Sequence, residues 1–131
     1  MIILDTGAVV ALARGHKALH LLAGNVAKSR GDRLIVPATC LMQAESADDI
    51  SRHVLALSSV AVDSLDAIAA ITVGVMVRDG YGGPDICHAL YCAMPRAEFA
   101  GMSILLTDRE EAYPPGVITV DIDSPGMLGF M

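Results

Sequence analysis

Residues 1–10 read MIILDTGAVV, in which an apolar run meets an aspartate and then resumes. Residues 1–4 predict a short buried strand, and residues 7–13 predict a short helix. Asp5, between them, has two interpretations. An aspartate before an apolar helix is a common N-terminal cap. An aspartate at the carboxyl end of a central parallel strand lies where open α/β sheets bind ligands. The remainder of the chain bears on the choice.

Strand and helix patterns alternate along the chain. Short apolar or β-branched runs predict strands at residues 1–4, 34–36, 60–62, 103–106 and 117–121. Apolar residues at helical spacing, bounded by Gly, Pro or Asp, predict helices at residues 7–13, 16–30, 38–47, 48–58, 66–78 and 85–93. Such alternation implies a parallel sheet covered on both faces. We therefore predict one α/β domain over residues 1–131, a three-layer α/β/α sandwich with a central, mostly parallel sheet and an apolar tail from about residue 124.

Length and composition fit a single cytoplasmic domain. The chain has 131 residues, of which 53% are hydrophobic. Its longest apolar run, AIAAITVGVMV at 67–77, is far shorter than the ~20 residues of a membrane-spanning helix. The cysteines lack CxxC spacing, which argues against a disulfide framework and a zinc site. Cys87, His88 and Cys92 lie close in sequence, but Cys87 and Cys92 point in different directions on a helix. We interpret the cysteines as core thiols.

The charges are unevenly distributed around a formal net charge of −6. Residues 14–33 hold five basic side chains against one acid, and residues 98–123 hold six acids against one arginine. This asymmetry fits an RNA-facing rim beside an acidic, metal-binding centre. The charges alone are explained more simply by a solvated helix followed by acidic loops. The candidate RNA-facing residues are Arg14, Lys17, Arg30 and Arg33.

Four acidic residues are placed to converge on one edge of the predicted sheet. Asp5 and Asp108 each follow a strand, and adjacent strands lie only ~5 Å apart. Glu45 lies on the helix after the strand LIVP, and Asp85 lies in the first turn of a helix after Gly-Gly-Pro. Taken singly, each has an ordinary explanation as a helix cap, a solvated residue or a turn residue. Together they would repel one another unless a hard divalent cation lay among them, and Mg²⁺ and Mn²⁺ prefer oxygen ligands.

The motifs around these acids resemble those of the PIN-domain nucleases. They are LDTGAVVALA with Asp5, PATCLMQAE with Glu45, GGPDICHALYCA with Asp85 and ILLTDRE with Asp108. The likeness is greatest to the small single-domain toxins of bacterial VapBC toxin–antitoxin pairs, and it runs from residue 1 to about residue 122. Each motif is short and weakly specific alone, but four of them occur in the family's order.

The resemblance implies a metal-dependent endoribonuclease that uses Mg²⁺ or Mn²⁺, as one or two ions. A bound ion would lower the pKa of a water molecule that attacks the scissile phosphate, and an ion would also neutralise the developing charge. The residues carried over as metal-binding and catalytic are Asp5, Glu45, Asp85 and Asp108, supported by the hydroxyls of Thr6 and Thr107.

Two positions depart from the family pattern. Many of these toxins have Ser or Asn two residues after the first aspartate, whereas this chain has Gly7. The fourth motif often reads TxDxD, but here Thr107 is followed directly by Asp108 and then by Arg109 and Glu110. The acids are shifted by one place, so Glu110 competes with Asp108 for the role of fourth metal ligand.

The toxin likeness also implies partners. RNA would be the substrate, and a VapB-like antitoxin protein would block the site by directing a basic side chain, best an arginine, at the acidic pocket. Homodimers or toxin–antitoxin hetero-oligomers are usual in the family. The expected antitoxin groove lies along the first helices, where the same apolar side chains would otherwise form the domain's own core. These side chains are Val9, Val10, Leu12, Leu19 and Leu22.

Two other functions stay open at this point. One is a PIN fold that has lost catalysis and serves as a binding module, which would suit the altered fourth motif and the negative charge. The other is a phosphoaspartate domain of the receiver or haloacid-dehalogenase type, since an aspartate after a first strand also serves as a phosphate acceptor. The phosphatase type would want an aspartate in place of Gly7, and the receiver type would want a lysine after a late strand, yet no lysine follows Lys28.

Overall fold

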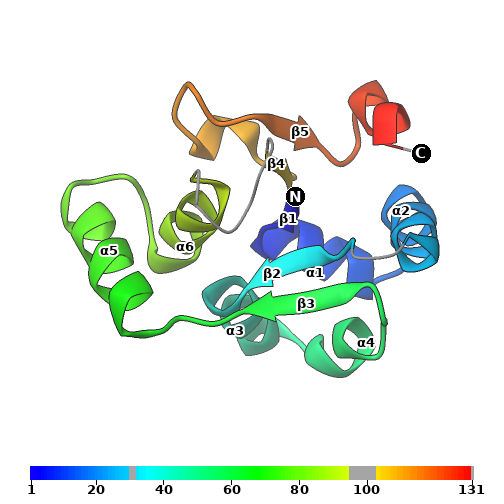
Figure 1. Cartoon of the computed structure of the whole chain (residues 1–131), viewed down its shortest axis with the longest axis horizontal. Coiled ribbons are helices and arrows are strands. Elements are labelled where there is room, and N and C mark those ends of the chain that lie inside the picture. Colours follow the sequence, from blue (N-terminus) through cyan, green and yellow to red (C-terminus); the bar gives the residue numbers. More distant parts are fainter. Residues whose placement is uncertain (30–31, 95–102, 131) are drawn as a thin grey trace.

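The computed structural model describes residues 1–29, 32–94 and 103–130. Strands and helices alternate along these ranges (Figure 1). The strands are β1 (Ile2–Leu4), β2 (Leu34–Pro37), β3 (Val60–Asp63), β4 (Ile104–Thr107) and β5 (Thr119–Asp121). The helices are α1 (Thr6–Ala13), α2 (Lys17–Lys28), α3 (Ala38–Ala47), α4 (Ser51–Leu55), α5 (Ala67–Arg78) and α6 (Pro84–Ala93), with the 3-10 helices η1 (Glu110–Ala112) and η2 (Pro125–Phe130).

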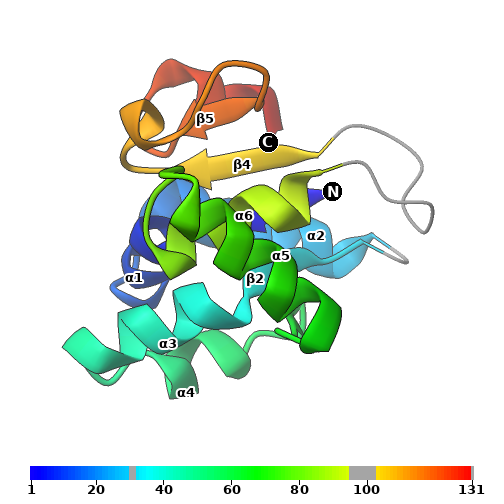
Figure 2. The same ribbon diagram turned by 90° about the vertical axis from the view of Figure 1, so that its left-hand side faces the viewer.

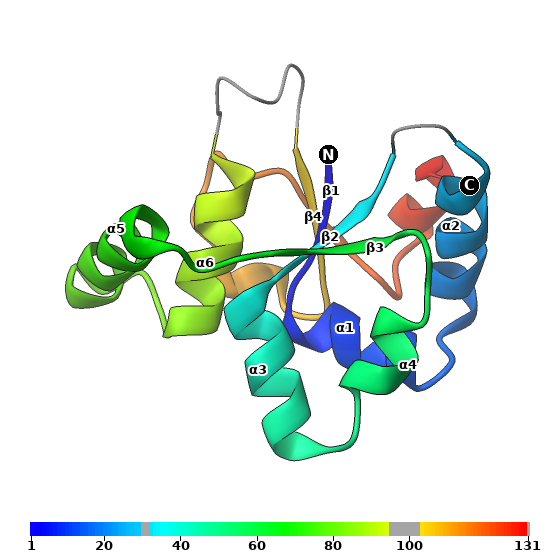
Figure 3. The ribbon, with the colours of Figure 1, turned by 60° about the horizontal axis from the view of Figure 1, so that its bottom comes forward.

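The five strands form one parallel sheet in the order β3-β2-β1-β4-β5. β1 lies at its centre, where Ile3 pairs with Ile35 of β2 and with Leu105 of β4. The predicted α/β fold with helices flanking a parallel sheet is therefore confirmed. Because all the strands run the same way, their last residues share one edge, which we call the carboxyl edge. In Figure 3, β1 runs from the N-terminus toward α1, which begins at this edge.

Apolar side chains cover both faces of the central strands. Successive residues of a strand point to opposite faces. Leu4 and Leu106 thus belong to the cluster under α1, α2 and α4, whereas Ile3 and Leu105 belong to the cluster under α6. α5 packs on α6 and lies outside the layers next to the sheet (Figures 1 and 2). The central strands β1, β2 and β4 carry near-continuous apolar runs because both of their faces are covered, whereas the edge strands β3 and β5 are only partly buried.

Two aspartates begin helices in the same way. The Asp5 carboxylate accepts a hydrogen bond from the backbone N–H of Ala8, at 3.1 Å, and caps α1. The Asp66 carboxylate accepts one from the N–H of Ala69, at 2.8 Å, and caps α5. Both satisfy a backbone donor that the first helical turn leaves unpaired.

The helix predicted over residues 48–58 is shorter than expected, because α4 spans only Ser51–Leu55. Asp48 is extended, with φ −164° and ψ 170°, and its carboxylate accepts a hydrogen bond from the N–H of Asp49 at 2.7 Å. The Glu45 carboxylate accepts hydrogen bonds from the N–H groups of Ile50 and Ser51. Carboxylates thus accept the hydrogen bonds of backbone N–H groups that helical carbonyls would have accepted if the helix had begun at residue 48.

The expected antitoxin groove lies mostly inside the domain. Four of its five apolar side chains are fully or nearly buried in the core on the α1 side of the sheet, and only Val10 is partly exposed. The C-terminal tail contributes to the same core through Met127, which is 2% exposed. Within the described ranges, no helix is both long and apolar enough to span a membrane.

Candidate active site at the carboxyl edge

Asp5 lies at the end of the central strand and is nearly buried, with 4% of its surface exposed. Its Oδ1 accepts the capping hydrogen bond from Ala8, and its Oδ2 accepts a hydrogen bond from the hydroxyl of Tyr113 at 2.7 Å. The two sequence-based interpretations of Asp5 are therefore compatible, because the same carboxylate caps α1 and stands at the carboxyl edge of the sheet.

Asp85 reaches the same edge from α6. Pro84 begins this helix, and Asp85 lies in its first turn, where a negative charge is favoured by the helix dipole. Thr6, the residue after Asp5, donates a hydrogen bond from Oγ1 to Asp85 Oδ2 at 2.8 Å. This bond joins two segments that are 79 residues apart in sequence. Thr6 thus links Asp85 to the Asp5 segment, and its role in supporting a metal ion stays a prediction.

Asp108 completes the group from β4. It follows Thr107 directly, is exposed, and has its carboxylate against the backbone of Gly7. A Cβ atom on Gly7 would overlap with the Asp108 carboxyl carbon and would lie 2.7 Å from its Oδ2. The absence of a side chain at Gly7 therefore provides the space that the Asp108 carboxylate occupies. We call Asp5, Asp85 and Asp108 the acid edge.

Burial and neighbouring charge disfavour the ionised form of Asp5. Burial raises the pKa of its carboxyl above the usual value of 3.8, and the charge of Asp108 raises it further. Hydrogen bonds from Thr107, Tyr113 and Ala8 lower the pKa and offset part of this effect. Thr107, which is fully buried, also accepts a hydrogen bond from the N–H of Arg109 at 3.0 Å. A buried carboxylate beside another carboxylate is the arrangement that a bound cation would stabilise.

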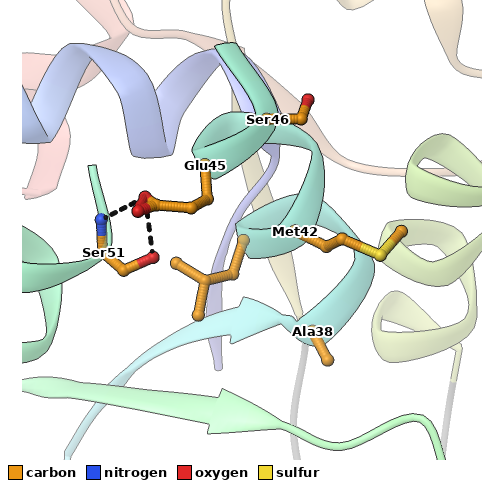
Figure 4. Close-up of a pocket in the computed structure, with 6 residues that line it drawn as sticks. Ala38, Met42, Glu45, Ser46 and Ser51 are labelled. Carbon is orange, nitrogen blue, oxygen red and sulfur yellow. Dashed lines mark hydrogen bonds between the residues drawn. The ribbon is translucent and has the colours of Figure 1, made fainter. Parts of the chain in front are cut away.

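Glu45, the remaining predicted ligand, is turned toward α4. Its Oε2 accepts hydrogen bonds from the N–H groups of Ile50 and Ser51, at 2.9 and 3.0 Å, and from the Ser51 hydroxyl at 3.0 Å. Figure 4 shows the carboxylate directed at Ser51, in an open hollow that Ala38 and Met42 also line. The N–H groups of Ser51 and Ile50 lower the pKa of the Glu45 carboxyl. Among the described residues, its hydrogen bonds thus go to Ile50 and to Ser51 at the start of α4, and none goes to the acid edge.

Glu110, the competing fourth acid, lies in η1 and is exposed. Its Oε1 accepts a hydrogen bond from Thr119 Oγ1 of β5 at 3.2 Å. Asp108, in contrast, lies against Gly7 and acts electrostatically on Asp5. Of the two acids, Asp108 is the one that the fold brings to the acid edge.

The candidate RNA-facing cations are scattered. Arg14 and Lys17 are exposed near the start of α2, and Arg14 pairs with Asp48 at 3.8 Å. Arg33 comes directly before β2, so it lies at the sheet edge opposite Asp5. Arg30 lies outside the described residues. These positions do not form one basic stripe beside the acid edge.

Two site residues were not predicted from the sequence. Tyr113 is 8% exposed and donates to Asp5, and its pKa is raised by burial and by the charges of Asp5 and Asp85. Cys40 is fully buried and donates from Sγ to the backbone oxygen of Asp85 at 3.3 Å. Burial raises the pKa of Cys40 to about 12, so it is a neutral thiol rather than a nucleophile. A tyrosine or cysteine gives no sequence signal of such a role beyond the rule that a buried hydroxyl finds a partner.

The donor atoms at the acid edge suit a hard divalent ion. The carboxylates of Asp5, Asp85 and Asp108, with the nearby Thr6 and Thr107 hydroxyls, offer only oxygen, which Mg²⁺ and Mn²⁺ prefer. Their ligand atoms do not all lie within 4.8 Å of one another in the described structure, so the side chains would have to move closer to share one ion. In the described part of the chain, no ion pair joins any of the three carboxylates to a lysine or arginine. Their negative charge therefore lacks a neutralising side chain there.

Comparisons of the chain with protein families, curated proteins and solved structures gave no significant match. The assignment of function consequently rests on the residues and their geometry.

Proposed function

We propose that this protein is a Mg²⁺- or Mn²⁺-dependent endoribonuclease of the PIN-domain type, acting as the toxin of a toxin–antitoxin pair in the cytoplasm. The observation that carries the proposal is the placement of Asp5, Asp85 and Asp108 around the carboxyl edge of the central strands: Thr6 joins Asp85 to the Asp5 segment, and Asp108 lies against Gly7 and raises the pKa of Asp5. Open α/β sheets bind ligands at this edge. The motifs around the three acids support the PIN-type assignment.

The acid edge would hold the ion through the Asp5, Asp85 and Asp108 carboxylates. When bound, a divalent ion lowers the pKa of a coordinated water and neutralises charge on the scissile phosphate. Tyr113 and Thr107 hold the Asp5 carboxylate in one orientation, and Thr6 does the same for Asp85. Such hydrogen bonds limit the orientations of each carboxylate, which reduces the conformational freedom that it would lose on binding an ion.

Glu45 would join this site only after leaving α4. Its three hydrogen bonds to Ile50 and Ser51 would have to break, and a rotation of the side chain about its own bonds is the smallest change that frees it. A site made from three carboxylates and water is sufficient for one Mg²⁺, which usually keeps several waters. The proposal therefore does not depend on Glu45.

A second candidate function is a binding module without catalysis. The position of Glu45 favours it, because a site that lacks one acid binds metal less tightly. The phosphate-acceptor alternative is less well supported, because Gly7 stands where the phosphatase type would have an aspartate and no lysine follows Lys28 for the receiver type.

The test is RNA cleavage by the purified chain, freed of any partner, with Mn²⁺, Mg²⁺ or EDTA. Asp5→Asn and Asp66→Asn form a matched pair, because both aspartates cap a helix through the same contact and Asn is itself a good cap. Cleavage that needs the metal, survives Asp66→Asn and disappears in Asp5→Asn supports the nuclease. If folded wild-type protein cleaves neither structured nor unstructured RNA with either metal, the binding-module function replaces it. An antitoxin would be sought as a co-purifying protein that stops RNA cleavage in the presence of metal.

A further inference from the structure

A second group of metal-ligating side chains, on β3 and α6, shares no residue with the acid edge. Asp63, His88 and Cys92 offer a carboxylate oxygen, an imidazole nitrogen and a sulfur that all lie within 4.8 Å of one another. His88 and Cys92 are four residues apart on α6, so they share one face of the helix. Asp63 is the last residue of β3, and its Oδ2 accepts a hydrogen bond from Cys92 Sγ at 2.9 Å.

The chemistry of this group differs from that of the acid edge. Nitrogen, sulfur and oxygen together suit Zn²⁺, whereas carboxylates and hydroxyls alone suit Mg²⁺ or Mn²⁺. His88 and Cys92 are fully buried, so an ion there has to be neutralised by its ligands. One thiolate and one carboxylate balance the charge of a divalent ion. The neutral imidazole adds a third ligand without changing that balance.

The distances need only a small adjustment for coordination. Zinc bonds of about 2.0–2.3 Å in a tetrahedral site place ligand atoms about 3.3–3.8 Å apart. Atoms already within 4.8 Å of one another approach this arrangement by side-chain movements of about 1 Å. Asp63 is only partly buried, so the group is reached from solvent at the end of β3.

The His88 ring is also oriented as a metal ligand requires. Its Nδ1 lies 3.0 Å from Thr39 Oγ1 and 3.4 Å from the backbone N–H of Thr39, which donates to it. Binding of a metal through Nε2 would require the tautomer with a proton on Nδ1, which Thr39 Oγ1 is placed to accept. Hydrogen bonds of this type fix the tautomer and the ring direction of zinc-bound histidines. Thr39 lies in the first turn of α3, so the bond also ties the ring to a third element.

We propose that Asp63, His88 and Cys92 form a Zn²⁺ site that fastens α6 to the end of β3. On binding, the Cys92 thiol loses its proton to solvent, the sulfur–metal bond replaces the S–H···O hydrogen bond, and Asp63 and His88 supply two further bonds. The fourth position is left for water. Because α6 also carries Asp85, the ion would fix the helix that presents one of the acid-edge carboxylates. The proposal does not require the nuclease function.

Cobalt(II) titration of the metal-stripped chain tests it, since thiolate-bound cobalt absorbs strongly in the near ultraviolet. The wild type is expected to show this sulfur-to-cobalt band at one ion per chain, with release of one proton per ion, and Zn²⁺ is expected to abolish the band by displacement. Cys92→Ser should lose the band. Cys87→Ser is the matched control, because Cys87 lies buried on the same helix outside the group, and it should keep the band.

Two further variants separate zinc binding from loss of folding and from the nuclease function. Asp63→Asn, at a partly exposed position, should retain the sulfur band but weaken cobalt binding at least about tenfold, about 1.4 kcal/mol. Asp5→Asn should leave the band and the affinity unchanged. Circular dichroism verifies that each variant is folded. The proposal is wrong if folded wild type gives no sulfur band, or if the band survives Cys92→Ser or vanishes in Cys87→Ser.

Discussion

Replacing Gly7 by alanine separates the stability of the fold from the function of the acid edge. The new methyl group would overlap with the Asp108 carboxylate, while the Gly7 backbone itself is helical. Asp108 is exposed, so its side chain is able to rotate away. The overlap is therefore relieved by moving a metal ligand rather than by disturbing the core.

We expect Gly7→Ala to maintain or raise the stability of the fold and to lower its metal affinity. Alanine is more favourable than glycine in a helix by up to about 1 kcal/mol, so Gly7→Ala should leave the free energy of unfolding unchanged or raise it by no more than that. Displacement of a ligand by about 1 Å can lower a catalytic rate by about a hundredfold. We expect metal affinity and RNA cleavage to fall by about tenfold to a hundredfold.

Urea unfolding, Mn²⁺ titration and RNA cleavage measure these effects. Gly24→Ala is the control, because Gly24 lies in α2 with nothing within 4 Å of an added Cβ, and it should gain stability without a loss of metal affinity. In an Asp108→Ala background, Gly7→Ala should cause no further loss of affinity, since the clash is gone. Retention of full metal affinity by Gly7→Ala in the wild-type background would refute the role given to Asp108.

Three further predictions concern single side chains. Tyr113→Phe removes the 2.7 Å hydrogen bond to Asp5 and should lower the free energy of unfolding at pH 8 by about 1–3 kcal/mol in urea, and an unchanged midpoint would contradict this. Asp5→Asn should raise the free energy of unfolding of the metal-free protein at neutral pH, because burial disfavours the ionised Asp5 carboxylate. The pKa of Asp5 is raised in the folded state, so Asp5 contributes stability below pH 3.8 that is lost as the pH rises through the folded-state pKa. The difference in free energy of unfolding between the variant and the wild type should therefore shrink on acidification. NMR titration should place the pKa of the Glu45 carboxyl below 4.5 in metal-free protein. Ser51→Ala removes the hydroxyl that donates to Glu45 and should raise this pKa. The stability that the ionised Glu45 contributes is present above pH 4.5 and is lost as the pH falls through the folded-state pKa.

Much of the fold was predictable because the apolar runs are unambiguous. The strand MIIL and the helix at residues 38–47 lie where the pattern placed them, since the strands are buried on both faces and Pro37 marks the junction between a strand and a helix. The helix over 48–58 was predicted too long. There the acidic side chains of Glu45 and Asp48 bond the local backbone, and helical spacing does not register that competition.

The site was predictable only as far as the strands position its residues. Asp5 and Asp108 meet because neighbouring parallel strands end together. The orientation of the Glu45 side chain was not predictable, since an exposed carboxylate near a helix end accepts hydrogen bonds from whichever backbone N–H groups the following turn places nearby. Tyr113 and Asp63 act on residues far away in sequence, at separations of 108 and 29, which no local pattern reveals. The sequence places Cys87 close to His88 and Cys92, but in the structure the residue that joins His88 and Cys92 in the candidate zinc site is Asp63.

Divalent-ion binding at the acid edge is the central claim, and it is testable without knowing the RNA substrate. The measurement is Mn²⁺ binding by electron paramagnetic resonance to metal-stripped wild type, Asp5→Asn and Asp66→Asn. We predict that wild type and Asp66→Asn bind Mn²⁺ equally, and that Asp5→Asn binds at least about tenfold more weakly, a difference of about 1.4 kcal/mol. Equal binding by wild type and Asp5→Asn, or no binding by folded wild type, would contradict the claim and leave Asp5 as a helix cap alone.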